Sequence, residues 1–164
     1  MDPSVTEPLR REHQGLRPHI DRLRDVAAAP SIDGLDEAIE FLAEQLVPHA
    51  LAEDVTLYPA VERLMAAPGA TQSMSRDHVE VARMIHDLRL LRTGIGDAST
   101  MDADDLEEAR RVLYGLYAVV RLHFQKEEEL YLPVLDAGLG AEEAAVLFEA
   151  MEKAAARVRT TTHV

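Results

Sequence analysis

Apolar residues recur along most of the chain in alternating steps of three and four. Such steps keep apolar side chains on one face of an α-helix and are typical of helices that pack side by side in a left-handed bundle. Four segments follow this pattern, and each contains one row of positions that we expect to be buried. The rows are Leu9, His13, Leu16, Ile20 and Leu23; Ile39, Leu42, Leu46, His49, Glu53 and Leu57; Met74, His78, Val81, Ile85 and Leu88; and Leu113, Leu116, Val120, His123, Glu127, Leu130 and Val134.

Breaks in this pattern divide the chain into five predicted helices. Glycine and proline gather at residues 30–34, 68–69 and 93–96, whereas the segments between them are rich in Ala, Leu, Glu and Arg. We expect helices at about residues 5–29, 35–66, 73–92 and 103–136, and a shorter helix at about 141–159. The residues that fit helix boundaries are Asp33, Ser73 and Asp102 at the starts, and Gly94 and Gly138 at the ends.

The connections between the first four helices are short, which favours neighbours that run in opposite directions. We therefore predict an all-α fold, an up-down-up-down four-helix bundle with its core at about residues 5–136. A short fifth helix follows at the C-terminus. The length of the chain favours one domain over residues 1–164.

Four prolines fall inside the predicted helices. A proline in a helix removes one backbone hydrogen bond and bends the axis. Pro48, for example, leaves the carbonyl of Glu44 without its usual helical partner. We expect bends rather than helix ends at these positions, which are Pro18, Pro48, Pro59 and Pro133.

Composition and charge narrow the classes of function. A chain of 164 residues can bury about 68–70% of the surface that its unfolded form exposes, so its core needs no disulfide. The absence of cysteine excludes a disulfide scaffold, a thiolate nucleophile and a Cys-ligated zinc or iron–sulfur site. The formal charge of -13 argues against nucleic acids and anionic membranes as partners. We see no apolar signal segment and no run of membrane-spanning length, so we expect a cytoplasmic protein.

The sequence contains an internal repeat. The triplet Arg-Glu-His at 11–13 returns as Arg-Asp-His at 76–78, an offset of 65 residues. The motif HxxxE followed by a proline six residues after the glutamate occurs at 49–59 and again at 123–133, an offset of 74 residues. Two helical hairpins related by a pseudo-twofold axis are therefore expected.

The histidines and glutamates of this repeat interrupt the four apolar rows at one level. Residues i and i+4 share a helix face, so each HxxxE presents an imidazole and a carboxylate to one point in the core. Without partners, such buried groups would cost about 1–3 kcal/mol each. A pair of metal cations removes that cost. The alternatives are a metal-free helical bundle and, for an isolated HxxxE, a surface ion pair, but the repeat inside apolar rows favours the metal.

With these motifs the sequence resembles the hemerythrin-like (HHE cation-binding) family. The resemblance rests on REH at 11–13, HALAE at 49–53, RDH at 76–78 and HFQKE at 123–127. It implies a non-haem centre of two iron ions bridged by oxide or hydroxide, although imidazole and carboxylate ligands also suit zinc or manganese. The resemblance implies a ligand set of four histidines, with two glutamates, Glu53 and Glu127, as bridges. From the hairpin geometry we assign His13 and His49 to one iron and His78 and His123 to the other, although the histidines could be exchanged between the two irons.

One departure from the family bears on function. Oxygen-carrying hemerythrins use HxxxH on the third helix, whereas here Ala82 and Met74 stand four residues after and before His78. Fewer protein donors leave coordination positions open, which is typical of reactive metal sites. We therefore expect a protein that reacts with or senses a small oxidant, namely O2, H2O2 or NO. The alternatives are an iron or oxygen sensor or adaptor without turnover, and a reversible O2 carrier; a protein partner is not predicted.

Other candidate residues lie near these motifs. We expect His19, His86 and His163 at the surface or on the flanks, and Glu128 and Glu129 on a solvated face. Tyr131, one turn after Glu127, could supply a phenol oxygen to the site. The favoured interpretation is that it packs at the edge of the bundle, as we expect for the other tyrosines, Tyr58, Tyr114 and Tyr117.

Overall fold

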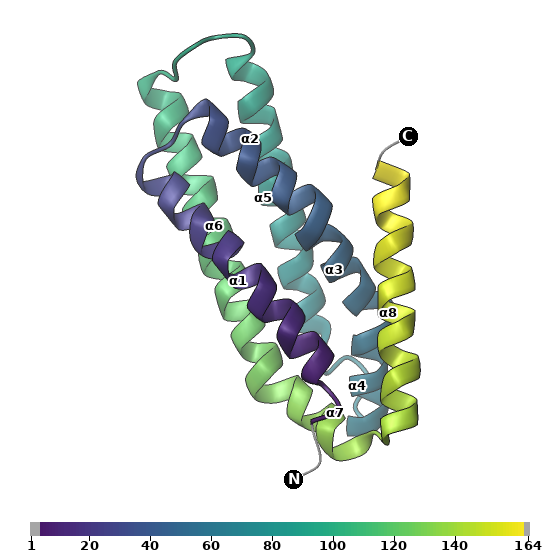
Figure 1. Cartoon of the computed structure of the whole chain (residues 1–164). Helices are drawn as coiled ribbons and strands as arrows, with labels where there is room; N and C mark the ends of the chain where they lie inside the picture. The colour runs from purple at the N-terminus through teal and green to yellow at the C-terminus, as the bar shows by residue number, and fades with distance from the viewer. Residues whose placement is uncertain (1–3, 163–164) are drawn as a thin grey trace.

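The computed structural model describes residues 4–162, and every regular element in that range is a helix. The prediction of an all-α chain is therefore confirmed for these residues, and Figure 1 shows the long helices side by side. The letter η marks a π-helical turn. The elements are α1 (Glu7–Ala28); the continuous segment α2 (Ile32–Phe41), η1 (Leu42–Leu46), α3 (Val47–Ala52), η2 (Glu53–Leu57) and α4 (Tyr58–Met65); α5 (Gln72–Ile95); the continuous segment α6 (Ala103–Lys126), η3 (Glu127–Tyr131) and α7 (Leu132–Gly138); and α8 (Ala141–Thr162).

Two helix starts show how side-chain capping sets the boundary. Ser31 precedes α2, and its hydroxyl accepts a hydrogen bond from the Gly34 amide at 3.1 Å, so the predicted cap at Asp33 is wrong. Asp102 is confirmed as the cap of α6. Its carboxylate accepts a hydrogen bond from the Asp105 amide at 2.8 Å, while the Asp105 side chain accepts one from the Asp102 amide.

The ends of α5 also differ from the prediction. The helix starts one residue before the predicted cap Ser73, and it continues one residue beyond Gly94. Gly96 then adopts a φ of 58°, which glycine tolerates without strain, and this residue ends the helix. Gly138 is the last residue of α7, close to the predicted stop.

The last helix is longer than predicted, because α8 has 22 residues, as many as α1. The alanines at 154–156 favour helix, and Ala144, Met151 and Ala155 are buried where α8 packs against α3 and η2. Within residues 4–162, no helix combines the length and the apolar composition needed to cross a membrane.

Each of the three π-helical turns stands just before a proline. The residue preceding each proline donates its amide to the carbonyl five residues earlier instead of four. A proline offers no amide and crowds the carbonyl four residues before it, so the wider turn accommodates the ring while the helix continues. The prolines concerned are Pro48, Pro59 and Pro133; Pro18 lies inside α1 without such a turn.

The extra residue in a π turn shifts the buried row by one position. Leu130, which we expected to be buried, is 57% exposed, and Val134 is only half-buried. Tyr131 and Leu135 are buried in their place. Beyond Glu127, counting in α-helical steps therefore selects the wrong side chains.

The apolar core forms two clusters with a polar layer between them. The helix α1 packs against α6 and α2, α5 packs against the same two elements, and α8 lies outside against α3 and η2 (Figure 1). On α1, His13 stands between Leu16 of the first cluster and Leu9 of the second. On the next segment, His49 and Glu53 separate the two clusters in the same way. The fold thus holds the polar residues of the repeat at one height.

Candidate metal centre

The structure brings the six predicted side chains together in this polar layer. The Glu53 carboxylate lies 2.9 Å from His49 Nε2 and 3.3 Å from His78 Nε2. The Glu127 carboxylate lies 3.4 Å from His13 Nε2 and 3.6 Å from His123 Nε2. His78 is 10% exposed, and the other five are buried more deeply.

Their potential ligand atoms form two overlapping groups, each with its atoms within 4.8 Å of one another. Glu53 belongs to both groups, because its Oε1 faces His49 and its Oε2 faces His78. A carboxylate that faces both ways is suited to bridge two cations. The groups are His13, His49, Glu53 and Glu127, and Glu53, His78 and His123.

Several of these buried atoms have no hydrogen-bond partner among the described residues. They are Nε2 of His13 and His49, both carboxylate oxygens of Glu53, and Oε2 of Glu127. In addition, Nε2 of His78 and Nε2 of His123 face each other at 3.0 Å. Leaving each such atom unpaired costs about 1–3 kcal/mol. Cations placed among these nitrogens and oxygens would bind them together, so the donor set fits a metal pair.

The outer nitrogen, Nδ1, of each histidine lies close to a carboxylate. A carboxylate can only accept, so each Nδ1 donates its proton and each Nε2 lone pair is left for the centre. This arrangement is typical of histidines that bind metals. The pairs are His13 with Glu128 at 3.1 Å, His49 with Glu12 at 3.0 Å, His78 with Asp54 at 2.9 Å and His123 with Asp77 at 3.2 Å.

These four carboxylates occur at equivalent positions of the internal repeat. Their role as hydrogen-bond partners of the histidines was not predicted from the sequence. Glu12 and Asp77 each precede a histidine of the repeated triplet, while Asp54 and Glu128 each follow a glutamate of the HxxxE motifs. The expectation that Glu128 belongs to a solvated face is wrong, because it also accepts a hydrogen bond from Arg17 at 2.7 Å. The signal that could have found them is an acidic residue beside four of the six ligands, repeated at the same two offsets.

A tyrosine that we expected at the edge of the bundle, Tyr58, lies in the site. Its hydroxyl donates to Glu127 Oε1 at 2.7 Å and lies 3.2 Å from His123 Nε2 and 3.4 Å from His78 Nε2. Burial, together with the charges of Glu53 and Glu127, raises the pKa of this phenol. Tyr58 is five residues after Glu53, and the π turn η2 brings these two residues to the same face of the helix. A search in α-helical steps of three and four overlooks this spacing.

Tyr131, by contrast, lies outside the site. Its hydroxyl donates to the carbonyl of Ala70 at 3.1 Å. The π turn η3 moves it out of register with Glu127, and at the position that matches Tyr58 in the repeat the chain has Leu132. The two halves of the site therefore differ by one phenol.

The position that we compared with the fifth histidine of oxygen carriers also needs correction. Ala82 is exposed, so a side chain there would point to solvent and not to the centre. Met74, the other candidate position, is fully buried in the same apolar cluster as Tyr58. The helix α5 therefore supplies one histidine fewer to the centre than the third helix of oxygen carriers, but a histidine at position 82 would not reach the centre.

Two of the remaining histidines are exposed, as expected, namely His19 and His86. His19 stacks on Phe41 with ring centroids 5.1 Å apart. The prediction for His163 lies outside the described residues.

The charges of the site are strongly interdependent. Burial, with the added charge of Glu53, raises the pKa of Glu127 to about 8. Burial also opposes charging of His49, but the charge of Glu53 and the hydrogen bond to Glu12 outweigh it and raise the pKa of His49. Burial likewise opposes ionisation of Glu53, yet the charge of His49 and the imidazoles around the carboxylate outweigh it and lower the pKa of Glu53. Protons thus partly neutralise the cluster, and bound cations would displace them.

A small cavity of about 20 Å³ borders the centre on the side of Glu53. It is large enough for one molecule the size of water. Phe124, on its wall, stacks on His13 with ring centroids 4.1 Å apart. The lining is His49, Glu53, His78 and His123 from the site, with Leu46, Ala50, Val81, Val120 and Phe124 around them.

A family model described as the hemerythrin HHE cation-binding domain matches residues 4–135 of the chain. The match includes all six predicted ligands and ends before α8. It confirms the resemblance that the four motifs indicated. No curated protein and no solved structure gives a significant match.

We predict that Glu128→Ala weakens metal binding by about 10–100-fold, because His13 loses the carboxylate that orients its ring. Glu129→Ala is the matched control, since Glu129 is exposed and its partner is Gln125. The affinity is measured by titrating metal-free protein with Fe2+ in the absence of oxygen. Equal affinities for the two variants would show that Glu128 does not support the site.

Proposed function

The chain belongs to the hemerythrin HHE cation-binding domain family, and on this basis we propose that it is a non-haem di-iron protein that reacts with or senses a small oxidant such as O2, H2O2 or NO. The observation that supports this most directly is Glu53, buried with its two oxygens directed at different histidines. A single cation would leave one of these oxygens without a partner. We also propose the up-down-up-down arrangement that the short connections favour.

In this proposal His13 and His49 hold one ion, His78 and His123 hold the other, and Glu53 and Glu127 bridge them. Nitrogen and oxygen donors with positions left open suit iron, and a bound iron pair supplies one-electron redox chemistry. The four outer carboxylates keep each imidazole in the tautomer that a metal requires. The group of Glu53, His78 and His123 has one carboxylate, whereas the other group has two. The Tyr58 hydroxyl lies beside this smaller group, so we assign it as a ligand or hydrogen-bond donor there.

The surroundings of the centre favour a very small ligand. The adjoining cavity holds about one small molecule, and apolar side chains form its remaining wall. Such a wall admits O2 or NO and excludes bulky substrates. The deficit of donors on α5 favours consumption of the oxidant over reversible storage, whereas sensing without turnover would use the same cavity.

We predict about two iron atoms per chain, since the donor atoms form two groups. His49→Ala and His123→Ala should each remove most of the iron. His86→Ala, which changes an exposed histidine on α5, should remove none. Elemental analysis of protein loaded with iron under anaerobic conditions gives the count, and a single iron in the unaltered chain would contradict the di-iron assignment.

We predict that Tyr58→Phe alters the visible spectrum of the oxidised iron protein and that Tyr131→Phe does not. A phenol oxygen bound to ferric iron gives an intense absorption band, which the first substitution would abolish. Tyr131 bonds to the carbonyl of Ala70 and provides the matched control. If the unaltered protein shows no such band, Tyr58 acts as the hydrogen-bond donor to Glu127 and not as a ligand.

We predict that Val81→Leu slows oxidation of the reduced protein by O2 several-fold while iron content is retained. The added methylene fills the cavity beside the centre, and it should cost about 1–3 kcal/mol in stability through overpacking. Val79→Leu, at a position 71% exposed on the same helix, is the control. Stopped-flow absorbance measures the rate. An unchanged rate in Val81→Leu would show that the ligand reaches the iron by another path.

A further inference from the structure

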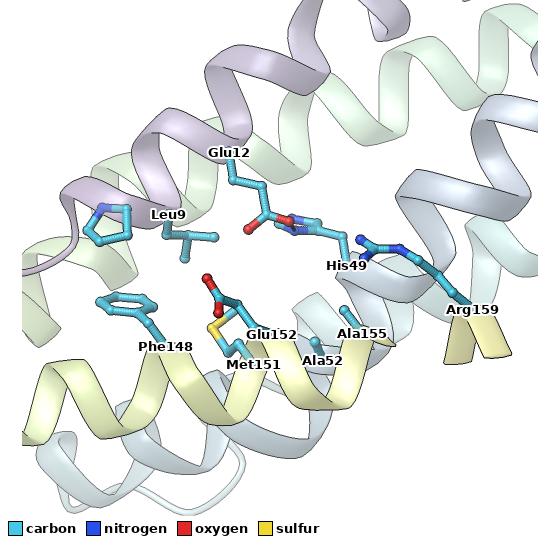
Figure 2. Close-up of a pocket in the computed structure, with 10 residues that line it drawn as sticks. Leu9, Glu12, His49, Ala52, Phe148, Met151, Glu152, Ala155 and Arg159 are labelled. Atoms are coloured by element: carbon cyan, nitrogen blue, oxygen red, sulfur yellow. Dashed lines mark hydrogen bonds and ion pairs between the residues drawn. The ribbon is translucent and has the colours of Figure 1, made fainter. Parts of the chain in front are cut away.

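A second and larger pocket opens between α1, α3 and α8, beside the metal centre (Figure 2). Its volume of about 420 Å³ falls in the range of small-molecule sites, about 300–1,000 Å³. Half of its lining comes from α8, which lies beyond the residues that match the family. The cation site of the family therefore does not account for this pocket.

The lining of the pocket changes in character along α8. Phe148 comes first and faces Leu9 of α1, Glu152 follows one turn later, and Arg159 stands at the far end. In Figure 2 the guanidinium of Arg159 extends back towards His49 and the middle of the pocket. Helical side chains lean towards the N-terminus of their helix, and the small Ala155 leaves room for this reach. The order along the pocket is thus apolar, acidic, basic.

The two charged groups of α8 are available to a ligand. Glu152 has no ion pair or hydrogen bond with another described residue. Among the described residues, the one hydrogen-bond partner of Arg159 is the carbonyl of Glu44, to which Nε donates at 3.4 Å. This is the carbonyl that Pro48 leaves without its helical partner. The terminal nitrogens of the guanidinium are left for a ligand. On the opposite wall, the Glu12 carboxylate is already bound to His49 Nδ1.

We propose that this pocket binds a small zwitterion with an apolar group, the chemical class of a hydrophobic α-amino acid. The apolar group contacts Phe148 and Leu9, the ammonium pairs with Glu152, and the carboxylate pairs with Arg159. In an α-amino acid the three groups are substituents of one carbon atom, so a single molecule presents all three to their partners in the pocket. One acidic and one basic group without other salt bridges match a ligand of zero net charge better than a simple anion or cation.

Calorimetric titration of the full chain with L-phenylalanine tests the proposal. We expect saturable binding. Phenethylamine lacks the carboxylate and 3-phenylpropionate lacks the ammonium, so each should bind about tenfold or more weakly, because each loses one charge-assisted contact.

Substitutions assign the two contacts. Glu152→Gln should weaken phenylalanine and phenethylamine but not 3-phenylpropionate, and Arg159→Gln should do the reverse. Glu149→Gln and Lys153→Gln are the matched controls, since these residues pair with each other on α8 outside the pocket lining. Melting curves of all four variants verify that the fold is retained.

Several results would overturn the proposal. These are an absence of saturable heat at about 10 mM phenylalanine, half-ligands that bind as tightly as the zwitterion, and equal losses in the control variants. Metal-free and iron-loaded protein should both bind phenylalanine. A chain that binds the amino acid but no iron would contradict the proposed function and leave this inference intact.

Discussion

The rest of the structure depends on the burial of one carboxylate, that of Glu53. A charge in an apolar core is tolerated only when several partners surround it. Here imidazoles from α1, α3, α5 and α6 converge on it, and each is held from behind by a carboxylate nearer the surface. The apolar clusters above and below have no polar role, but they fix the height at which these helices meet.

The π turns connect this constraint to the backbone. Glu53 and Glu127 are each the first residue of such a turn, and each turn ends beside a proline. The wider turn accommodates the proline ring, and it changes which later side chain returns to the site. In the first half this brings in Tyr58. In the second half the equivalent residue is Leu132, while Tyr131 turns away to the carbonyl of Ala70.

The sequence was sufficient for the helices, the buried level and the six residues that meet there, because periodicity and the repeat are both visible in one dimension. It failed where the count of residues per turn changed. For this reason Leu130 was predicted to be buried where Tyr131 is, and Tyr58 was overlooked. Glu128 was misjudged for another reason: a run of acidic residues is normally solvated, and only the third dimension brings it to His13. The prediction that Ala82 marks the position of a missing ligand was wrong for a third reason. Spacing along a helix does not show whether the residue one turn after a ligand faces the metal centre, and Ala82 faces solvent.

The two halves of the molecule are alike in their ligands and unlike in what surrounds them. The hydroxyl of Tyr58 lies close to both imidazoles of the group around His78 and His123. In the group around His13 and His49, which has both glutamates, it lies close to no imidazole of the described residues and donates to Glu127. On the side of His49 the outer carboxylate, Glu12, is 45% exposed and faces the pocket under α8, while the other three outer carboxylates are 23–27% exposed. A repeat that is symmetric in its ligands therefore offers two inequivalent positions. The half beside α8 is the one that a molecule in the pocket would influence, through Glu12 and His49.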